Sequence, residues 1–230
     1  LVGQIPTGAQ GKGHGLLHEI PDQFGILERL TKSSHRVTGG GDAVGHVVDA
    51  FTSLVSGRPQ PVGLEIAVNL WTQDVTGNLP DLAPPGHPAP AVDTDAIDRA
   101  AKLIASARAP MIVVGGGAQG DSGPVRQLAA RTGAPVVAFR TGHGVMSSDD
   151  PLSIGMPVAH SLWTDVDLVI GLGTRLQSQV MSWGHDEDMK IIHIDIDQTQ
   201  IGRSAPVDIG IHARLADALP LLIRAVEDLA

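Results

Sequence analysis

The sequence predicts an α/β fold in which a parallel sheet is covered by helices on both faces. Two observations carry this prediction: apolar segments of strand length alternate with helical segments, and the strand segments end in glycine or acidic residues. Residues 190–197 contain four isoleucines at positions that cannot all face one side, so both faces of that strand must be covered. Ligands in such sheets bind at the carboxyl ends of the strands, so the glycines and acids there suggest a nucleotide-binding domain.

The composition indicates one large or two ordinary globular domains. The chain has 230 residues, of which 42% are hydrophobic and only 3% aromatic, so aliphatic side chains must build the core. The net charge of −9 argues against a nucleic-acid or anionic-membrane partner. No apolar run approaches the roughly 18 residues of a membrane span. The absence of cysteine excludes thiolate chemistry and fits a cytoplasmic location.

Residues 1–78 are expected to form a first α/β region. Residues 1–6 have the character of the end of a strand, and a strand without a preceding element suggests a piece cut from within a domain. Apolar side chains at helical spacing predict a helix over residues 41–54, with Asp42 as its N-cap. Residues 61–66 are predicted to form a short strand.

A second domain is expected over residues 94–230, after a proline-rich linker at residues 79–93. The five prolines of that stretch fix φ and remove backbone donors, so an extended conformation is predicted. The first helix of the second domain is expected to begin with Thr94 as N-cap. Strands and helices then alternate, as in right-handed βαβ units. The predicted strands are 110–114, 135–139, 166–170 and 191–196, and the predicted helices are 94–104, 124–131 and 215–229.

An ordered set of segments resembles the thiamine-diphosphate-dependent enzymes of the acetolactate synthase (large subunit) type. Residues 2–7 and 57–62 are similar to segments late in the pyrimidine-binding domain of that family. The segments similar to its central domain are 100–104, 115–117, 150–155, 171–175 and 193–197. The resemblance implies that residues 1–78 are the C-terminal part of the pyrimidine-binding domain. It also implies that residues 94–230 are the central domain, with a Rossmann-like sheet of the DHS-like NAD/FAD-binding type.

The resemblance implies a decarboxylase or carboligase that acts on a 2-keto acid with thiamine diphosphate and Mg²⁺, in a homodimer or homotetramer. In that family, the glutamate that activates thiamine lies upstream of the similar region. The Gly-Asp-Gly…Asn segment that holds Mg²⁺ and the diphosphate lies downstream of it. Neither motif is found in this sequence. We therefore expect these 230 residues alone to be inactive.

Two candidate substrate contacts follow from the resemblance. His18 precedes Glu19 where the family usually has a Gln-Glu pair near the active-site entrance, so it is a departure from the family pattern. An imidazole titrates near neutrality and suits a proton relay or a hydrogen bond to a keto-acid carboxylate. Gln4 is the second candidate. The alternative is that His18 is an ordinary surface or packing histidine.

A glycine turn follows the first predicted strand of the second domain. Without Cβ atoms, its backbone can approach a diphosphate and offer N–H groups. By resemblance to flavin-containing relatives, the residues that would contact FAD are Gly115, Gly116, Gly117, Thr141, Gly142, Gly173, Thr174, Arg175, Asp195 and Ile196. Alternatively, the glycines only permit a tight turn. Arg214 stands where flavin-containing relatives have an aspartate, which counts against FAD, so the flavin question stays open.

Other chemistries are less well supported. The ten histidines form no HxH or HExxH pair, so no metal site is predicted. Two rival functions remain: an NAD-binding, deacylase-like domain and a non-catalytic regulatory or scaffolding paralogue. The first would leave the similarity of residues 1–66 unexplained.

Overall fold

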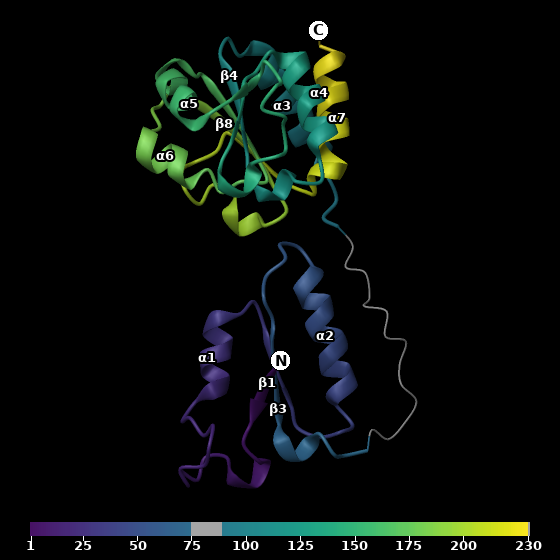
Figure 1. Ribbon diagram of the computed structural model, residues 1–230. Coiled ribbons are helices and arrows are strands. Elements are labelled where there is room, and N and C mark those ends of the chain that lie inside the picture. The colour runs from purple at the N-terminus through teal and green to yellow at the C-terminus, as the bar shows by residue number, and fades with distance from the viewer. Residues whose placement is uncertain (75–88, 230) are drawn as a thin grey trace. The chain divides into compact units, whose positions relative to one another are not determined.

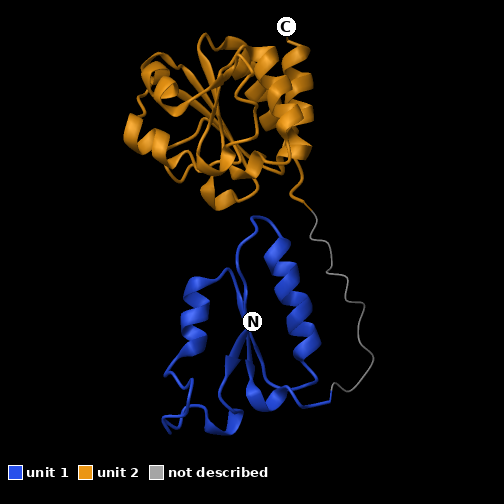
Figure 2. Cartoon of the chain, viewed as in Figure 1, with its two compact units in different colours: residues 1–88 blue, residues 89–230 orange. Residues whose placement is uncertain are grey.

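All strand pairings in the described part of the chain, residues 1–74 and 89–229, are parallel. The computed structural model contains a three-stranded and a six-stranded sheet (Figure 1). They belong to two units, residues 1–88 and 89–230 (Figure 2). Among the described residues, no helix is long and apolar enough to cross a membrane.

The six-stranded sheet has the order β6–β5–β4–β7–β8–β9. Its strands are β4 (Pro110–Val114), β5 (Val136–Ala138), β6 (Ser153–Ile154), β7 (Leu168–Leu172), β8 (Lys190–Asp195) and β9 (Ile209–His212). This is the doubly wound order of Rossmann folds, which confirms the predicted Rossmann-like class. The order reverses between β4 and β7, so the ligand-binding position of such folds lies at the carboxyl ends of these two strands.

Helices cover both faces of this sheet (Figure 1). One face packs against α3 (Thr94–Ser106), α4 (Ser122–Thr132) and α7 (Leu215–Glu227), and the other packs against α5 (Met156–Leu162) and α6 (Gln177–Trp183). Strand β4 serves both cores: Ile112 and Val114 lie in the first, and Met111 and Val113 lie in the second. All four side chains are fully buried, which explains the unbroken apolar sequence of this strand.

The start of α3 corrects one prediction. Its N-cap is Asp93 rather than Thr94, because Oδ1 of Asp93 accepts a hydrogen bond from the backbone N–H of Ala96 at 3.0 Å. Thr94 is the first residue inside the helix. A carboxylate is a good cap, since it satisfies a free amide and meets the positive end of the helix dipole. Asp93 is the last residue of the predicted linker, whose residues 79–88 lie outside the described part.

The first unit has the strand order β1–β3–β2. Its elements are β1 (Val2–Gln4), α1 (Gln23–Leu30), β2 (Ser34–Val37), α2 (Ala43–Val55) and β3 (Gly63–Ala67). The helix predicted at residues 41–54 and the strand predicted at residues 61–66 are confirmed, with small shifts of their ends. Helix α1 and strand β2 were not predicted. Short 3-10 turns complete the two units at Thr7–Ala9, Val68–Leu70, Gly116–Ala118, Arg140–Gly142, Trp163–Asp165 and Gln198–Gln200.

Asp42 stands at the N-cap position of α2, but its carboxylate does not cap the helix. It accepts hydrogen bonds from the backbone N–H groups of Thr38 and Gly39, both at 3.1 Å, and from the Thr38 hydroxyl. These bonds lower the pKa of Asp42, with the Thr38 hydroxyl as the largest cause. The carboxylate therefore stabilises the turn between β2 and α2 instead of the first turn of the helix.

The apolar face of α2 is more exposed than its spacing predicts. Only Thr52 of this helix is buried, whereas Phe51 is 57% and Val55 58% exposed. The described core of this unit is small: its buried members are Val37, Ala67 and Leu70. A three-stranded sheet covers only part of each helix, so side chains far from the strands remain accessible.

Candidate functional site

At the carboxyl ends of β4 and β7, two glycine turns pack backbone against backbone. The N–H of Gly115 donates to the carbonyl of Leu172 at 3.2 Å, and the N–H of Gly117 donates to the carbonyl of Gly173 at 3.0 Å. A Cβ on Gly115 would lie 2.4 Å from the carbonyl oxygen of Gly173, and a Cβ on Gly117 would lie 2.8 Å from its Cα. No side chain fits between the turns, so their packing requires glycine.

The turn after β5 packs against the first glycine turn in the same way. A Cβ on Gly142 would lie 2.3 Å from the carbonyl oxygen of Val114, and a Cβ on Gly116 would lie 2.8 Å from Oγ1 of Thr141. The side chain of Gln119 spans the two turns, because its Nε2 donates to the carbonyls of Thr141 and His143 at 2.6 and 2.9 Å. Three predicted contact segments therefore meet at one edge of the sheet.

This packing uses backbone groups that were predicted to contact FAD. The N–H of Gly117 already has an acceptor within the protein, so it is not offered to a diphosphate. Gly116, Thr141 and Arg175 remain exposed at this edge, and the Arg175 side chain forms no ion pair with any described carboxylate. The glycines are explained by the fold alone, and the sequence pattern of this turn does not by itself indicate FAD.

A buried histidine lies beneath this edge, on β8. His193 is 2% exposed, and its Nε2 lies 2.7 Å from the carbonyl oxygen of Thr174. A carbonyl only accepts, so Nε2 carries the hydrogen and donates it. Burial lowers the pKa of His193, although the bond to Thr174 and the Asp195 carboxylate, 4.0 Å away, act in the opposite sense. His193 therefore holds the turn after β7 through the bond from Nε2 to Thr174.

Asp195 and Arg214 are engaged in local structure. Oδ1 of Asp195 accepts from the backbone N–H of Asp197 at 2.8 Å, which turns the chain just after β8, where Ile196 lies half-buried. Arg214 pairs with Asp217 in the first turn of α7, with Nε 2.7 Å from Oδ2. Arg214 thus binds a carboxylate of its own helix.

The first unit contains a pocket of about 590 Å³ beside the carboxyl end of β1. Glycines of the loop at residues 11–15 form part of its wall, and its polar lining includes Gln4, Glu19, Gln23 and Arg36. Amide and guanidinium groups in one concave site can hydrogen-bond a small anionic molecule. The structure therefore places Gln4, a predicted substrate contact, in the wall of a pocket.

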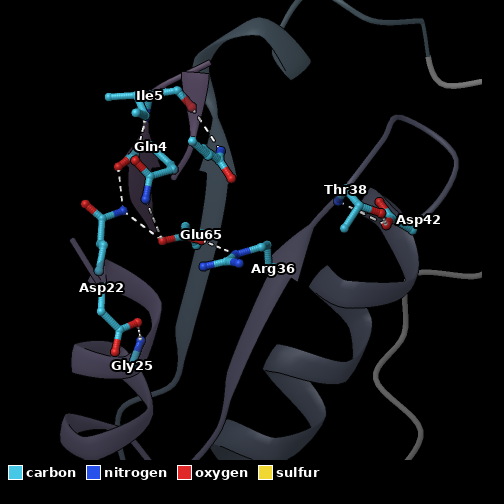
Figure 3. A network of polar contacts seen from close by, with 11 residues as sticks. Gln4, Ile5, Asp22, Gly25, Arg36, Thr38, Asp42 and Glu65 are labelled. Atoms are coloured by element: carbon cyan, nitrogen blue, oxygen red, sulfur yellow. Dashed lines mark hydrogen bonds and ion pairs between the residues drawn. The ribbon is translucent and has the colours of Figure 1, made fainter. Parts of the chain in front are cut away.

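A buried carboxylate organises this pocket (Figure 3). Glu65, on β3, is 1% exposed, and its Oε1 accepts from Nε2 of Gln4 at 3.2 Å and from Nε2 of Gln23 at 2.9 Å. Its Oε2 pairs with Nε of Arg36 at 2.5 Å. The backbone N–H of Ile5 donates to Oε1 of Gln4 at 2.7 Å, which fixes the orientation of that amide. Buried charge is tolerated here because every carboxylate oxygen has a donor.

His18 is not brought together with Gln4. It is exposed, has the left-handed φ of 71°, and does not line the pocket. Its neighbour Glu19 does line the pocket. The Glu19 carboxylate accepts from the backbone N–H groups of Gly13 and Leu16 at 3.0 and 2.9 Å, and the bond from Leu16 is the largest cause that lowers its pKa. Glu19 thus closes the glycine-rich loop. The substrate contact of His18 stays a prediction.

The sequence reasoning missed the roles of Gln23, Arg36 and Glu65. One signal was available: Glu65 occupies an inward position of a strand whose burial alternates, with Gly63 and Ala67 as its buried neighbours on the same side. A carboxylate at such a position requires donors from adjacent elements. Which residues supply them depends on the strand order, and that order is not visible in the sequence.

Comparison with known proteins identifies the sheet of the second unit. The family described as thiamine pyrophosphate enzyme, central domain, matches residues 97–222, which is more than half of the chain. The chain belongs to this family of thiamine pyrophosphate enzymes. The matched residues run from α3 to α7, so they include the glycine turns and His193. The resemblance found in the sequence is confirmed.

Relatives match the chain across both units. It is 30% identical to the large subunit of acetolactate synthase isozyme 1 from Escherichia coli, with 99% of this chain and 41% of that protein covered. It is 31% identical to the acetolactate synthase large subunit of Corynebacterium glutamicum, with 99% and 37% covered. It is 30% identical to the chloroplastic acetolactate synthase 1 of rice, with 95% and 35% covered. The chain spans about two fifths, or slightly less, of the length of these curated relatives.

Proposed function

We propose that this chain is part of a thiamine-diphosphate-dependent enzyme that decarboxylates a 2-keto acid and joins the remaining unit to an acceptor carbonyl, like an acetolactate synthase. The observation that carries the proposal is the extent of the match: relatives named acetolactate synthase are similar over as much as 99% of the chain. A similarity confined to the Rossmann-like sheet would suit many nucleotide enzymes. Similarity that also includes the first unit favours this family over an NAD-binding deacylase.

Within this proposal, the thiamine diphosphate and Mg²⁺ are held by groups outside these 230 residues. The sequence contains no Gly-Asp-Gly segment. The bound thiamine would supply the carbanion chemistry, and the protein would position the substrate. The residues of this chain would contribute substrate-side contacts and the scaffold of a homo-oligomer, in the cytoplasm. The absence of cysteine supports that location.

Gln4 is the residue of this chain that we assign to the substrate side. It lines the pocket, and its amide is held by Glu65 on one side and by the backbone of Ile5 on the other. Only one of the two Nε2 hydrogens is used by Glu65, so the other can donate to a keto-acid carboxylate. His18 is the second assigned contact, and it rests on the resemblance alone.

The cofactor assignment can be tested without measuring activity. Calorimetric titration of the 230-residue polypeptide with thiamine diphosphate and Mg²⁺ is expected to give no binding heat. Saturable binding would contradict the proposal that the groups holding the diphosphate lie elsewhere. FAD is a separate question, because Gly116, Thr141 and Arg175 are exposed at the carboxyl edge of the sheet. Quenching of flavin fluorescence by this polypeptide, weakened in Arg175→Ala, would assign FAD to that edge.

A further inference from the structure

We infer that His35, His46 and Asp49 form a binding site for a divalent transition metal ion between β2 and α2. One ligand atom from each side chain lies within 4.8 Å of the others. The two imidazole rings have their centroids 5.8 Å apart. His46 and Asp49 are three residues apart in α2 and therefore share one helix face, while His35 comes from the adjacent strand.

The donor set selects the class of ion. Two imidazoles and one carboxylate suit Zn²⁺, which binds such sets through three protein ligands and keeps one position open. Ni²⁺ and Cu²⁺ also accept imidazole nitrogen, whereas Mg²⁺ and Ca²⁺ prefer sites made of oxygen alone. A nitrogen-rich set of this size therefore points to a transition metal rather than to the Mg²⁺ that accompanies thiamine diphosphate in this family.

Each histidine also has a polar neighbour outside the three ligands. Nε2 of His46 lies 3.6 Å from Oδ2 of Asp42, and Nε2 of His35 lies 3.4 Å from Oγ of Ser33. Metal-bound imidazoles are usually oriented by such outer partners. Oγ of Ser33 is itself held by the hydroxyl of Ser53, at 2.8 Å.

The site is accessible and needs only a small closing movement. His35 and His46 are half-buried and Asp49 is exposed, so an ion can enter from solvent. Asp49 forms no ion pair with any described cation. With metal–ligand bonds of about 2.1 Å, tetrahedral ligand atoms lie roughly 3.4 Å apart. The present ligand atoms lie within 4.8 Å of one another, so they must approach by at most about 1.4 Å. Rotation of partly exposed side chains can provide this.

Binding of one ion by all three side chains would join α2 to β2. Hydrogen exchange can detect this link, and an ion bound at a single surface histidine would not produce it. Of the three ligands, His35 lies on strand β2, whereas His46 and Asp49 lie on helix α2. An ion held by all three side chains would raise the protection of α2 and β2 amides against hydrogen exchange, because opening the helix would require release of the metal. Binding at a single surface histidine would not.

The test is titration of the 230-residue protein with ZnCl₂, followed by calorimetry and by hydrogen exchange. We expect one equivalent to bind with an affinity that falls at least about 10-fold in His35→Ala and in His46→Ala. Asp49→Asn, which keeps the size of an exposed side chain, is expected to weaken binding as well. His143→Ala removes an exposed histidine of the other unit and serves as the matched control, with unchanged affinity.

Two results would overturn the inference. One is a zinc affinity that is the same in wild type, His35→Ala and His46→Ala, which would assign the bound ion to other histidines. The other is hydrogen exchange of α2 that does not change at saturating zinc. Circular dichroism of each variant without metal establishes that a loss of binding does not come from a loss of fold.

Discussion

Replacing Gly115 by alanine tests whether the glycine turns at the carboxyl edge of the sheet are packing devices. The added Cβ would lie 2.4 Å from the carbonyl oxygen of Gly173, 2.8 Å from Cα of Thr174 and 2.8 Å from Cβ of Thr174. All three distances are below those that real Cβ atoms show. Two of the three atoms belong to the backbone of a turn that packs against β4, so relief requires the turns to separate.

The expected cost follows from that geometry. Overpacking a well-packed site typically costs 1–3 kcal/mol, and contacts with backbone belong near the upper end, at about 3 kcal/mol. Separation of the turns would also weaken the hydrogen bond from Gly115 to Leu172, which adds about 1 kcal/mol. With a urea dependence of about 2 kcal/mol per M, a loss of about 3–4 kcal/mol lowers the unfolding midpoint by about 1.5–2 M.

Tryptophan fluorescence provides the assay. Trp163 is 2% exposed and lies in the second unit, so its emission changes when that unit unfolds, whereas Trp71 of the first unit is already 54% exposed. Gly123→Ala is the matched control, because a Cβ there meets nothing within 4 Å and α4 gains up to about 1 kcal/mol of helix propensity. Equal midpoints for Gly115→Ala and wild type would refute the packing account and would leave close approach of a ligand as the reason for the glycine.

Two further predictions concern buried ionisable groups. Glu65→Ala removes the acceptor of three donors, so we expect the free energy of unfolding of the first unit to fall by about 2 kcal/mol. Hydrogen exchange of the β3 amides measures this loss. Arg36 is partly exposed, so water can solvate it again, and this limits the loss of stability. Exposed Glu28→Ala should change β3 exchange little, and equal effects of both variants would contradict the role of the network. Burial lowers the pKa of His193, so the unfolded state takes up a proton at higher pH than the native state, and the unfolding free energy should fall as pH drops below about 6.5, by at most about 1.4 kcal/mol per pH unit. His193→Gln keeps a donor for Thr174 and should flatten the pH dependence of the unfolding free energy between pH 7 and 5. An unchanged pH dependence would show that groups other than His193 cause it.

The sequence predicted the central sheet well because its strands are buried on both faces. β4 and β7 contain no polar side chain, and the isoleucines of β8 are interrupted only by His193. Each of the three strands ends in or is followed by glycine or acid, which is a strong local signal. β6 has two residues and α5 and α6 seven each, too few for a periodic pattern to stand out. Thr94 and Asp93 are both acceptable caps, and a one-residue shift of the helix start decides between them.

The site residues were less predictable, because they meet through strand order. The glycines were found, but a glycine required by a neighbouring backbone and a glycine required by a ligand look the same in a sequence. Glu65 and Arg36 lie on neighbouring strands in register, and this pairing follows from the order β1–β3–β2. Likewise, His35 and His46 lie on different elements, so no spacing rule for metal ligands detects them.

We propose that these residues belong to a thiamine-diphosphate-dependent carboligase. The most direct test is to express the complete reading frame that encodes them and to measure acetolactate formation from pyruvate with thiamine diphosphate and Mg²⁺. The 230-residue polypeptide is measured alongside. We predict product that depends on both cofactors from the complete frame and none from the 230 residues. A folded product of the complete frame that neither binds thiamine diphosphate nor consumes any 2-keto acid would contradict the claim.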